Sequence, residues 1–191
     1  MNVPDIETAR LHFRRFTMDD WDALAELFSD PEVVRFLGDG KPPDKAECLA
    51  HLRNFIENYW TERRLGRWAL IHKEDGKLIG YCGLRLLEGA PELTYVLAKA
   101  YWGRGLATEA ARACLRYGFV ELRLERIVAV TRPENVASQH VMEKLAMKCE
   151  GEKRFYGIDC IYYSISRQDY QPDASPYLLC FAPSNMTVEQ D

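Results

Sequence analysis

The sequence predicts a mixed α/β protein built on a single, mostly antiparallel sheet of six to seven strands, flanked by about four to five helices. Residues 68–72 and 78–86 are apolar runs on either side of the turn signal Glu74-Asp75-Gly76, which indicates an antiparallel hairpin. Residues 92–131 run in the order strand, glycine-rich loop, helix and strand, and this order implies a parallel pair within the sheet. The 191 residues are 47% hydrophobic and 28% charged, which is typical of one globular domain.

The first third of the chain predicts one strand followed by three helices. Apolar and charged side chains alternate over residues 9–15, which predicts a strand. Thr17 and Asp20 resemble a capping box, and apolar residues at helical spacing follow them. A short helix is expected at residues 31–37, and Asp44 is placed to cap a longer one. None of these elements indicates a particular chemistry.

The elements after the hairpin form the βαβ unit and a final hairpin. Residues 92–98 predict a strand, and residues 126–131 contain the β-branched run that is typical of a strand buried on both faces. Asn135 or Ser138 can begin another helix. Two last strands are expected at about 148–156 and 159–166, joined by the turn Tyr156-Gly157-Ile158-Asp159.

The composition changes after Arg167, so we expect a domain at residues 1–170 and a partly ordered C-terminal tail at residues 171–191. Within the tail, Tyr177–Phe181 is apolar enough to pair with a sheet edge or with a second subunit. The expected assembly is therefore a monomer or a homodimer.

Charge and composition argue against several classes of function. The net charge of −4 without a dense basic run argues against nucleic-acid binding. The first residues do not have the profile of a signal peptide, and no apolar run approaches the roughly 20 residues that span a bilayer. The protein is therefore expected in the cytoplasm and away from membranes. Six cysteines and four histidines are scattered without CxxC or HExxH spacing, so no metal site is expected.

The loop YWGRGLATEA at residues 101–110 is a candidate anion site. A helix start exposes unpaired N–H groups and the positive end of the helix dipole, and Gly103 and Gly105 allow the backbone to come close to a ligand. A P-loop is excluded because no Lys-Ser/Thr pair follows these glycines. A dinucleotide fingerprint would need Gly or Ala where Thr108 stands, although Glu125 lies near the distance expected of a ribose-binding acid. On these residues alone, a dinucleotide site and a turn without a ligand both stay open.

Together with NVASQHVMEKLAMK at residues 135–148, this loop resembles the coenzyme A site of the GNAT superfamily of N-acetyltransferases, and within it the RimJ/RimL-type group. The stretches TARLHFRRF, DPEVVRFLG and LIGYCGL resemble further elements of that family. The resemblance implies a GNAT fold, whose twisted sheet is splayed at a central parallel pair, and acetyl-CoA as co-substrate. It also implies a set of coenzyme contacts, namely the backbone of Tyr95, Val96 and Leu97 for the pantetheine arm, Asn135 beyond it, and Gly103, Arg104, Gly105, Leu106, Ala107 and Thr108 for the pyrophosphate.

The chemistry of acetyl transfer to an amine needs a proton acceptor, a proton donor and an oxyanion donor. The resemblance places Glu92 as the base and Ser138 as the acid, with a backbone N–H of residues 95–97 at the oxyanion. Each residue also has a non-catalytic interpretation: Glu92 as a solvated carboxylate at the end of a strand, and Ser138 as a helix cap. The tyrosine that serves as general acid in many relatives falls at Met142 in this sequence, so that role is vacant or is filled elsewhere.

The function expected from these residues is an N-acetyltransferase that acts by direct attack in a ternary complex. The acceptor is an amine-bearing small molecule or the α-amine of a protein N-terminus. Aromatic side chains can line the acceptor pocket, and the candidates are Trp60, Trp68, Tyr81 and Tyr156. Two alternatives stay open: a non-catalytic acyl-CoA-binding module and a dinucleotide-binding oxidoreductase.

Overall fold

The structure is a computed structural model that describes residues 3–57 and 64–181. The strands are β1 (Asp5–Glu7), β2 (Leu11–Arg14), β3 (Arg67–His72), β4 (Leu78–Leu87), β5 (Ala90–Leu97), β6 (Arg126–Thr131), β7 (Lys148–Phe155), β8 (Ile158–Ser166) and β9 (Leu178–Cys180). The α-helices are α1 (Trp21–Ser29), α2 (Pro31–Val34), α3 (Lys45–Glu57), α4 (Leu106–Arg116) and α5 (Val136–Lys144).

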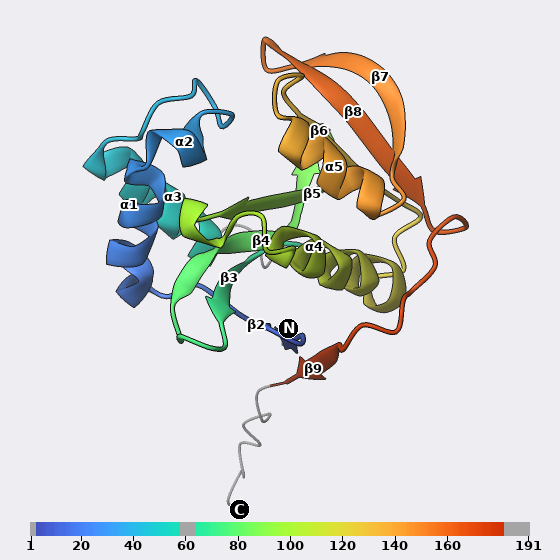
Figure 1. The fold of residues 1–191 in the computed structure, drawn as a ribbon, viewed down its shortest axis with the longest axis horizontal. Coiled ribbons are helices and arrows are strands. Elements are labelled where there is room, and N and C mark those ends of the chain that lie inside the picture. Colours follow the sequence, from blue (N-terminus) through green and yellow to red (C-terminus); the bar gives the residue numbers. More distant parts are fainter. Residues whose placement is uncertain (1–2, 58–63, 182–191) are drawn as a thin grey trace, which may run out of the picture.

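The strands form one sheet in the order β7-β8-β6-β5-β4-β3-β2-β1-β9 (Figure 1). Neighbouring strands are antiparallel except for β5 and β6, which form the parallel pair that the βαβ order predicts. The expected fold class is therefore confirmed. The sheet has nine strands, more than the six to seven expected, because β1 precedes the predicted first strand and β9 comes from the predicted tail. β1 and β9 have three residues each, and an alternation of apolar and polar side chains is hard to recognise over so few positions.

Two hydrophobic cores lie on opposite faces of the sheet. One core packs α4 and Met142 of α5 against the strands, and the other packs α1, α2 and α3 against Ala69, Tyr81 and Val96. Figure 1 shows α1–α3 gathered at one end of the sheet, and α5 beside the strands β6–β8 at the other end. Helices α1–α3 therefore cover the sheet on one side of the parallel pair, and α5 covers it on the other side.

The parallel pair is joined at one position, where Glu92 of β5 lies beside Val128 of β6. On its other side, β5 pairs continuously with β4 from Ala90 to Leu97. Residues 93–97 of β5 therefore have one edge that lies along the opening between β5 and β6. This geometry agrees with the splay that the family resemblance implies.

The segment expected as a tail adds a strand to the edge of the sheet. β9 pairs antiparallel with β1, and Leu178 and Cys180 lie opposite Glu7 and Asp5. The guanidinium of Arg116, the last residue of α4, lies 4.6 Å from the centre of the Tyr177 ring. This contact attaches the residue directly before β9 to α4. No helix within residues 3–57 and 64–181 is long and apolar enough to cross a membrane.

The capping box predicted at Thr17 and Asp20 is present, and Asp44, the predicted cap of the longer helix, forms a second capping box with Glu47. Asp44 accepts a bond from the Glu47 N–H, and the Glu47 carboxylate accepts one from the Asp44 N–H, both at 2.8 Å. The Thr17 N–H donates to Asp20 Oδ2 at 2.8 Å, where a short 3₁₀ turn leads into α1. The short helix expected at residues 31–37 ends earlier, at Val34.

Asp20 also forms a partly buried ion pair with Arg14, and this pair leads to a stability prediction. Arg14 donates two bonds to its carboxylate, at 2.8 and 2.6 Å. Burial alone would raise the pKa of Asp20, but the bonds from Arg14 and Thr17 outweigh burial and lower that pKa. Asp20→Asn is expected to lower the free energy of unfolding by about 2–3 kcal/mol at pH 7, measured by urea unfolding.

The pH dependence of this loss has a defined sign. Because the folded-state pKa of Asp20 is lowered, its contribution is complete above the unfolded-state pKa of about 4 and is lost as the pH falls through the folded-state value. The difference between wild type and Asp20→Asn should therefore shrink below about pH 4. Asp19→Asn, at an exposed neighbouring position, is the control and should change little. Equal stability of wild type and Asp20→Asn at pH 7 would refute the assignment.

Candidate active site

The glycine loop forms the start of α4. Gly103 has φ +69° and Gly105, the N-cap residue, has φ +76°. A Cβ atom at Gly103 would meet nothing within 4 Å, and at Gly105 it would meet only Arg10 Nη2 at 3.6 Å. The glycines are therefore required by the left-handed backbone, which costs other L-residues about 1–2 kcal/mol, rather than by crowding. The space at the Cβ position of Gly103 is open, and the loop leads directly into the first turn of α4, where an anion site is expected.

Two side chains of the loop, Trp102 and Arg104, contact segments outside α4. Trp102 Nε1 donates to the Leu97 carbonyl at 2.7 Å, which ties the loop to the end of β5. The Arg104 guanidinium lies 5.3 Å from the centre of the Tyr101 ring and 3.8 Å from a carboxylate oxygen of Glu74, in the β3–β4 turn. The backbone of Arg104, rather than its side chain, is thus placed at the helix start.

Tyr95 and Ser138 meet across the opening between β5 and β6. The Tyr95 hydroxyl lies 2.8 Å from Ser138 Oγ and donates to the Ser138 carbonyl at 3.1 Å. Burial raises the pKa of Tyr95, so its hydroxyl stays protonated at neutral pH. Asn135 is the N-cap of α5 and accepts the Ser138 N–H at 3.2 Å. The helix cap is therefore Asn135, and the Ser138 hydroxyl bonds to tyrosine instead.

Glu92 lies inside the protein and carries an ion pair. It is 2% exposed, so the alternative of a solvated strand-end carboxylate is wrong. Arg85 lies directly opposite on β4, and its Nε donates to Glu92 Oε2. The sequence reasoning missed Arg85, although a single charge in the apolar run LIGYCGLRLL was a signal that a partner lies on the neighbouring strand.

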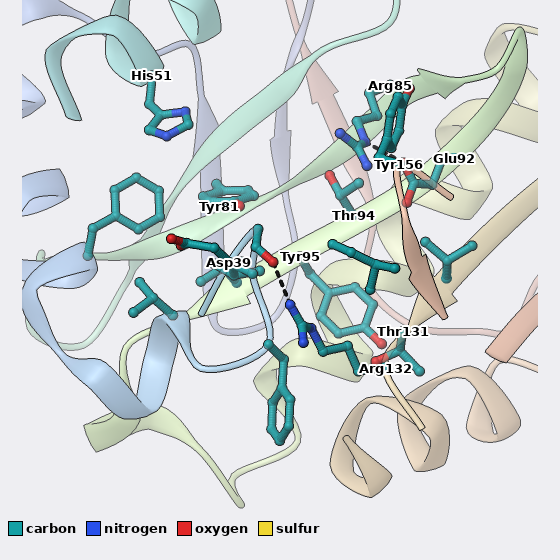
Figure 2. Close-up of a pocket in the computed structure, with 18 of the residues that line it drawn as sticks. Asp39, His51, Tyr81, Arg85, Glu92, Thr94, Tyr95, Thr131, Arg132 and Tyr156 are labelled. Carbon is teal, nitrogen blue, oxygen red and sulfur yellow. Dashed lines mark hydrogen bonds and ion pairs between the residues drawn. The ribbon is translucent and has the colours of Figure 1, made fainter. Parts of the chain in front are cut away.

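A cleft of about 910 Å³ joins these groups (Figure 2). Its floor is formed by β3, β4 and β5, one wall by α1–α3 and the loop after α2, and the other wall by β6, α5 and the β7–β8 turn. Four of the predicted site residues line the cleft, namely Glu92, Tyr95, Val96 and Ser138. Leu97, Asn135 and residues 103–108 lie outside its lining.

The aromatic candidates for the acceptor pocket divide into two groups. Tyr81 and Tyr156 line the cleft, and Figure 2 shows them over its floor and beside Glu92. Trp68 is fully buried in the core and packs edge-on against Tyr117 at 5.0 Å, so its assignment to the pocket was wrong. Trp60 lies outside the described residues.

Two further arginines line the cleft and were not predicted. Arg67 is 8% exposed, donates from Nε to Thr94 Oγ1 at 3.2 Å, and lies over the rings of Phe55 and Tyr81. Arg132 donates to the Gly38 carbonyl in the loop after α2, and Figure 2 shows this bond beside Tyr95. The bond connects the two walls of the cleft.

Strand alternation places Glu92 and Tyr95, the bonding partner of Ser138, on opposite faces of β5. Val96 packs in the core that faces α1–α3, and Tyr95 packs against the core that faces α4 and α5. Glu92 shares the face of Val96, because side chains at even spacing point the same way. A proton acceptor and a hydroxyl pair thus flank the strand from opposite faces.

The matched family model describes an acetyltransferase (GNAT) domain, and the match covers residues 10–148. The chain belongs to the GNAT family. Its relatives include the uncharacterized N-acetyltransferase p20 of Bacillus licheniformis, 31% identical over 172 residues that cover 85% of this chain and 96% of p20. Spermidine N(1)-acetyltransferase of Escherichia coli is 36% identical over 78% of each chain. The crystal structure of a GNAT-family acetyltransferase from Bacillus anthracis superposes with a TM-score of 0.75 at 29% identity and covers 86% of this chain and 99% of its own.

Family membership decides between the classes that the sequence left open. The chain is an N-acetyltransferase, and acetyl-CoA is its acetyl donor. The dinucleotide-binding oxidoreductase and the non-catalytic acyl-CoA module are therefore wrong. Within residues 3–57 and 64–181, no group of three or more His, Cys, Asp or Glu side chains is arranged to hold a metal ion.

Proposed function

We propose that this GNAT acetyltransferase moves the acetyl group to a primary amine by direct attack in a ternary complex, with Glu92 as the general base. The observation that carries the proposal is the position of Glu92, which is 2% exposed and lines the same cleft as Tyr95 and Ser138. A carboxylate in such a cleft can accept a proton from an amine that is held against the thioester.

The coenzyme is proposed to follow β5 from the glycine loop to the cleft. The N–H groups at residues 103–108 would hold the pyrophosphate, because the open space at Gly103 and the positive end of α4 suit an anion. The backbone of residues 95–97 would hold the pantetheine arm along the splay, with Asn135 beyond it. We also propose the RimJ/RimL-type subgroup, which rests on the motif WGRGLATEA.

Acetyl-CoA supplies the acetyl group as a thioester, so the transfer forms a C–N bond, breaks a C–S bond and moves one proton from nitrogen to sulfur. Glu92 would accept the proton of the amine, directly or through one water molecule. Arg85 would hold the carboxylate in place through the bond from its Nε. Ser138 would give its hydroxyl proton to the sulfur from the opposite face of β5 and regain one from solvent, to which Glu92 loses the proton taken from the amine. Tyr95 would orient the Ser138 hydroxyl.

Stabilisation of negative charge on the thioester oxygen is assigned to a backbone N–H of residues 95–97. This segment pairs with β4 on one side and lies along the splay on the other. Strand backbone is rigid, so a donor there needs little reorganisation during the reaction. Positioning of the two substrates would add a further contribution of about 7–11 kcal/mol to the lowering of the barrier.

For the acceptor, we propose a small-molecule primary amine. The volume of about 910 Å³ lies in the range of small-molecule sites, and the bond from Arg132 to the Gly38 carbonyl connects the two walls of the cleft. The relative that is named for spermidine supports a small amine as acceptor. A protein N-terminus is the second candidate, because the proposed RimJ/RimL-type motif favours it.

Coenzyme binding and turnover test the proposal in two steps. Thermal unfolding should shift upward with acetyl-CoA and CoA and stay unchanged with NAD, since a ligand at 100 times its Kd adds about 2.7 kcal/mol of stability. Release of free thiol is then followed with a panel of polyamines, amino acids, aromatic amines and N-terminal peptides. Turnover confined to peptides would refute the small-molecule acceptor, and coenzyme binding without thiol release from any member would refute transfer to a primary amine.

A further inference from the structure

The turn between β1 and β2 is hydrogen-bonded to the first turn of α4 through one side chain, the carboxylate of Glu109. Glu109 accepts three bonds from this turn, at 2.7 Å from the Thr8 hydroxyl, at 2.8 Å from the Arg10 N–H and at 2.7 Å from Arg10 Nε. The side chain of Glu109 is 14% exposed and that of Arg10 is 46% exposed. A carboxylate in the first turn of a helix suits the helix dipole in general, but the three bonds of Glu109 show a specific contact.

Arg10 also bonds to the glycine loop itself. Its Nη1 donates to the Arg104 carbonyl at 2.8 Å, and its Nη2 is the nearest group to the position that a Cβ would take on Gly105. The peptide between Arg104 and Gly105 is trans, so its carbonyl and its N–H point to opposite sides. Because Arg10 holds the carbonyl on one side, the Gly105 N–H is directed to the other.

Arg10 also neutralises the negative charge that Glu109 places at the start of α4. Burial would raise the pKa of Glu109, but the bonds from Thr8 and Arg10 outweigh burial and lower it. Glu109 is therefore ionised at neutral pH, in the first turn of the helix that would bind the coenzyme phosphates. A carboxylate there would repel them, and the guanidinium of Arg10 neutralises it at 2.7 Å.

We propose that Arg10 is a positioning residue for the pyrophosphate loop: anchored by Glu109, it fixes the Arg104–Gly105 peptide so that the loop N–H groups face the coenzyme. This inference rests on the proposed function in one respect, that residues 103–108 hold the pyrophosphate. It assigns the anchor to a residue of the β1–β2 turn, which lies outside the cleft.

The test compares two acetyl donors in Arg10→Ala. Acetyl-CoA carries the pyrophosphate, whereas S-acetyl-pantetheine has the same thioester without any phosphate. Arg10→Ala is expected to raise the KM for acetyl-CoA by about tenfold or more, with kcat within about twofold, because one charge-assisted bond and the loop geometry are lost. The kcat/KM for S-acetyl-pantetheine is expected to stay within about twofold of wild type.

Further variants separate charge from geometry. Arg10→Lys keeps the charge but cannot bond Glu109 and the Arg104 carbonyl with one planar group, so its KM for acetyl-CoA should lie between those of wild type and Arg10→Ala. Arg10→Ala/Glu109→Gln should recover part of the affinity, since the unpaired carboxylate is gone. Arg112→Ala, which removes an exposed arginine of the same helix, is the control and should match wild type.

Three outcomes would overturn the proposal. An equal loss of kcat/KM with both donors in Arg10→Ala would show that Arg10 acts on the fold or on the chemical step. A fall in kcat at an unchanged KM for acetyl-CoA would show the same. If Arg10→Ala does not fold, an unchanged KM in Arg10→Lys would count against the proposal. The proposed function is tested separately, with the wild-type enzyme alone. It would be refuted by a KM for acetyl-CoA that is no lower than the KM for S-acetyl-pantetheine.

Discussion

Replacing Glu92 by Gln is expected to lower kcat for acetyl transfer by about 10²-fold to 10³-fold at pH 7.5, which is the range of a lost general base. Gln has nearly the same shape and can still accept the bond from Arg85, so the cleft should keep its geometry. The KM for acetyl-CoA should change little, since Glu92 lies apart from the proposed phosphate loop. Steady-state rates of thiol release, measured with both substrates varied, give these constants.

The pH profile of Glu92→Gln provides a second readout. Without a base, only the unprotonated amine reacts, so the rate should rise with pH up to the pKa of the acceptor, about 10.4 for a lysine-type amine and about 7.7–8.0 for an α-amine. Glu88→Gln, on the exposed end of the same hairpin, is the matched control and should behave as wild type. A Glu92→Gln enzyme with wild-type kcat and an unchanged profile would exclude Glu92 as the base.

Replacing Ser138 by Ala is expected to lower the rate of acetyl transfer by about tenfold to 10²-fold. The effect should be smaller than that of Glu92→Gln, because a thiol has an ordinary pKa of about 8.5 and its thiolate leaves without full protonation. Tyr95→Phe removes the hydroxyl that lies 2.8 Å from Ser138 Oγ and should cost less than Ser138→Ala. Single-turnover rates at saturating acetyl-CoA measure this step apart from product release.

The order of the two effects identifies the proton donor. If Tyr95→Phe is slower than Ser138→Ala, the tyrosine rather than the serine reaches the sulfur. His140→Ala, at an exposed position of the same helix, is the control. Wild-type single-turnover rates in both Ser138→Ala and Tyr95→Phe would show that neither hydroxyl delivers the proton.

Local patterns were sufficient to predict the elements that would carry the proposed coenzyme site. The hairpin of β3 and β4, the separate elements of the βαβ unit and the capping box of Thr17 and Asp20 each depend on residues within a few positions of one another, and each was found where the sequence placed it. The loop glycines are also a local signal, because the left-handed values of +69° and +76° at Gly103 and Gly105 favour glycine over other residues.

The contacts that define the proposed catalytic cleft could not be predicted in this way. The burial of Glu92 and its pairing with Arg85 depend on the register of β4 and β5. The bond between Tyr95 and Ser138 spans 43 positions and depends on how α5 docks across the splay, and the bond of Arg10 to Glu109 spans 99. Such contacts follow from tertiary packing, which periodicity along the chain does not encode.

The most direct test of the account is a crystal structure of the chain with coenzyme A. The account predicts the pyrophosphate oxygens on the N–H groups of residues 103–108, the pantetheine arm beside residues 95–97, and the sulfur near Ser138 within the cleft that Glu92 also lines. A pyrophosphate bound away from the start of α4, or a sulfur outside this cleft, would contradict it.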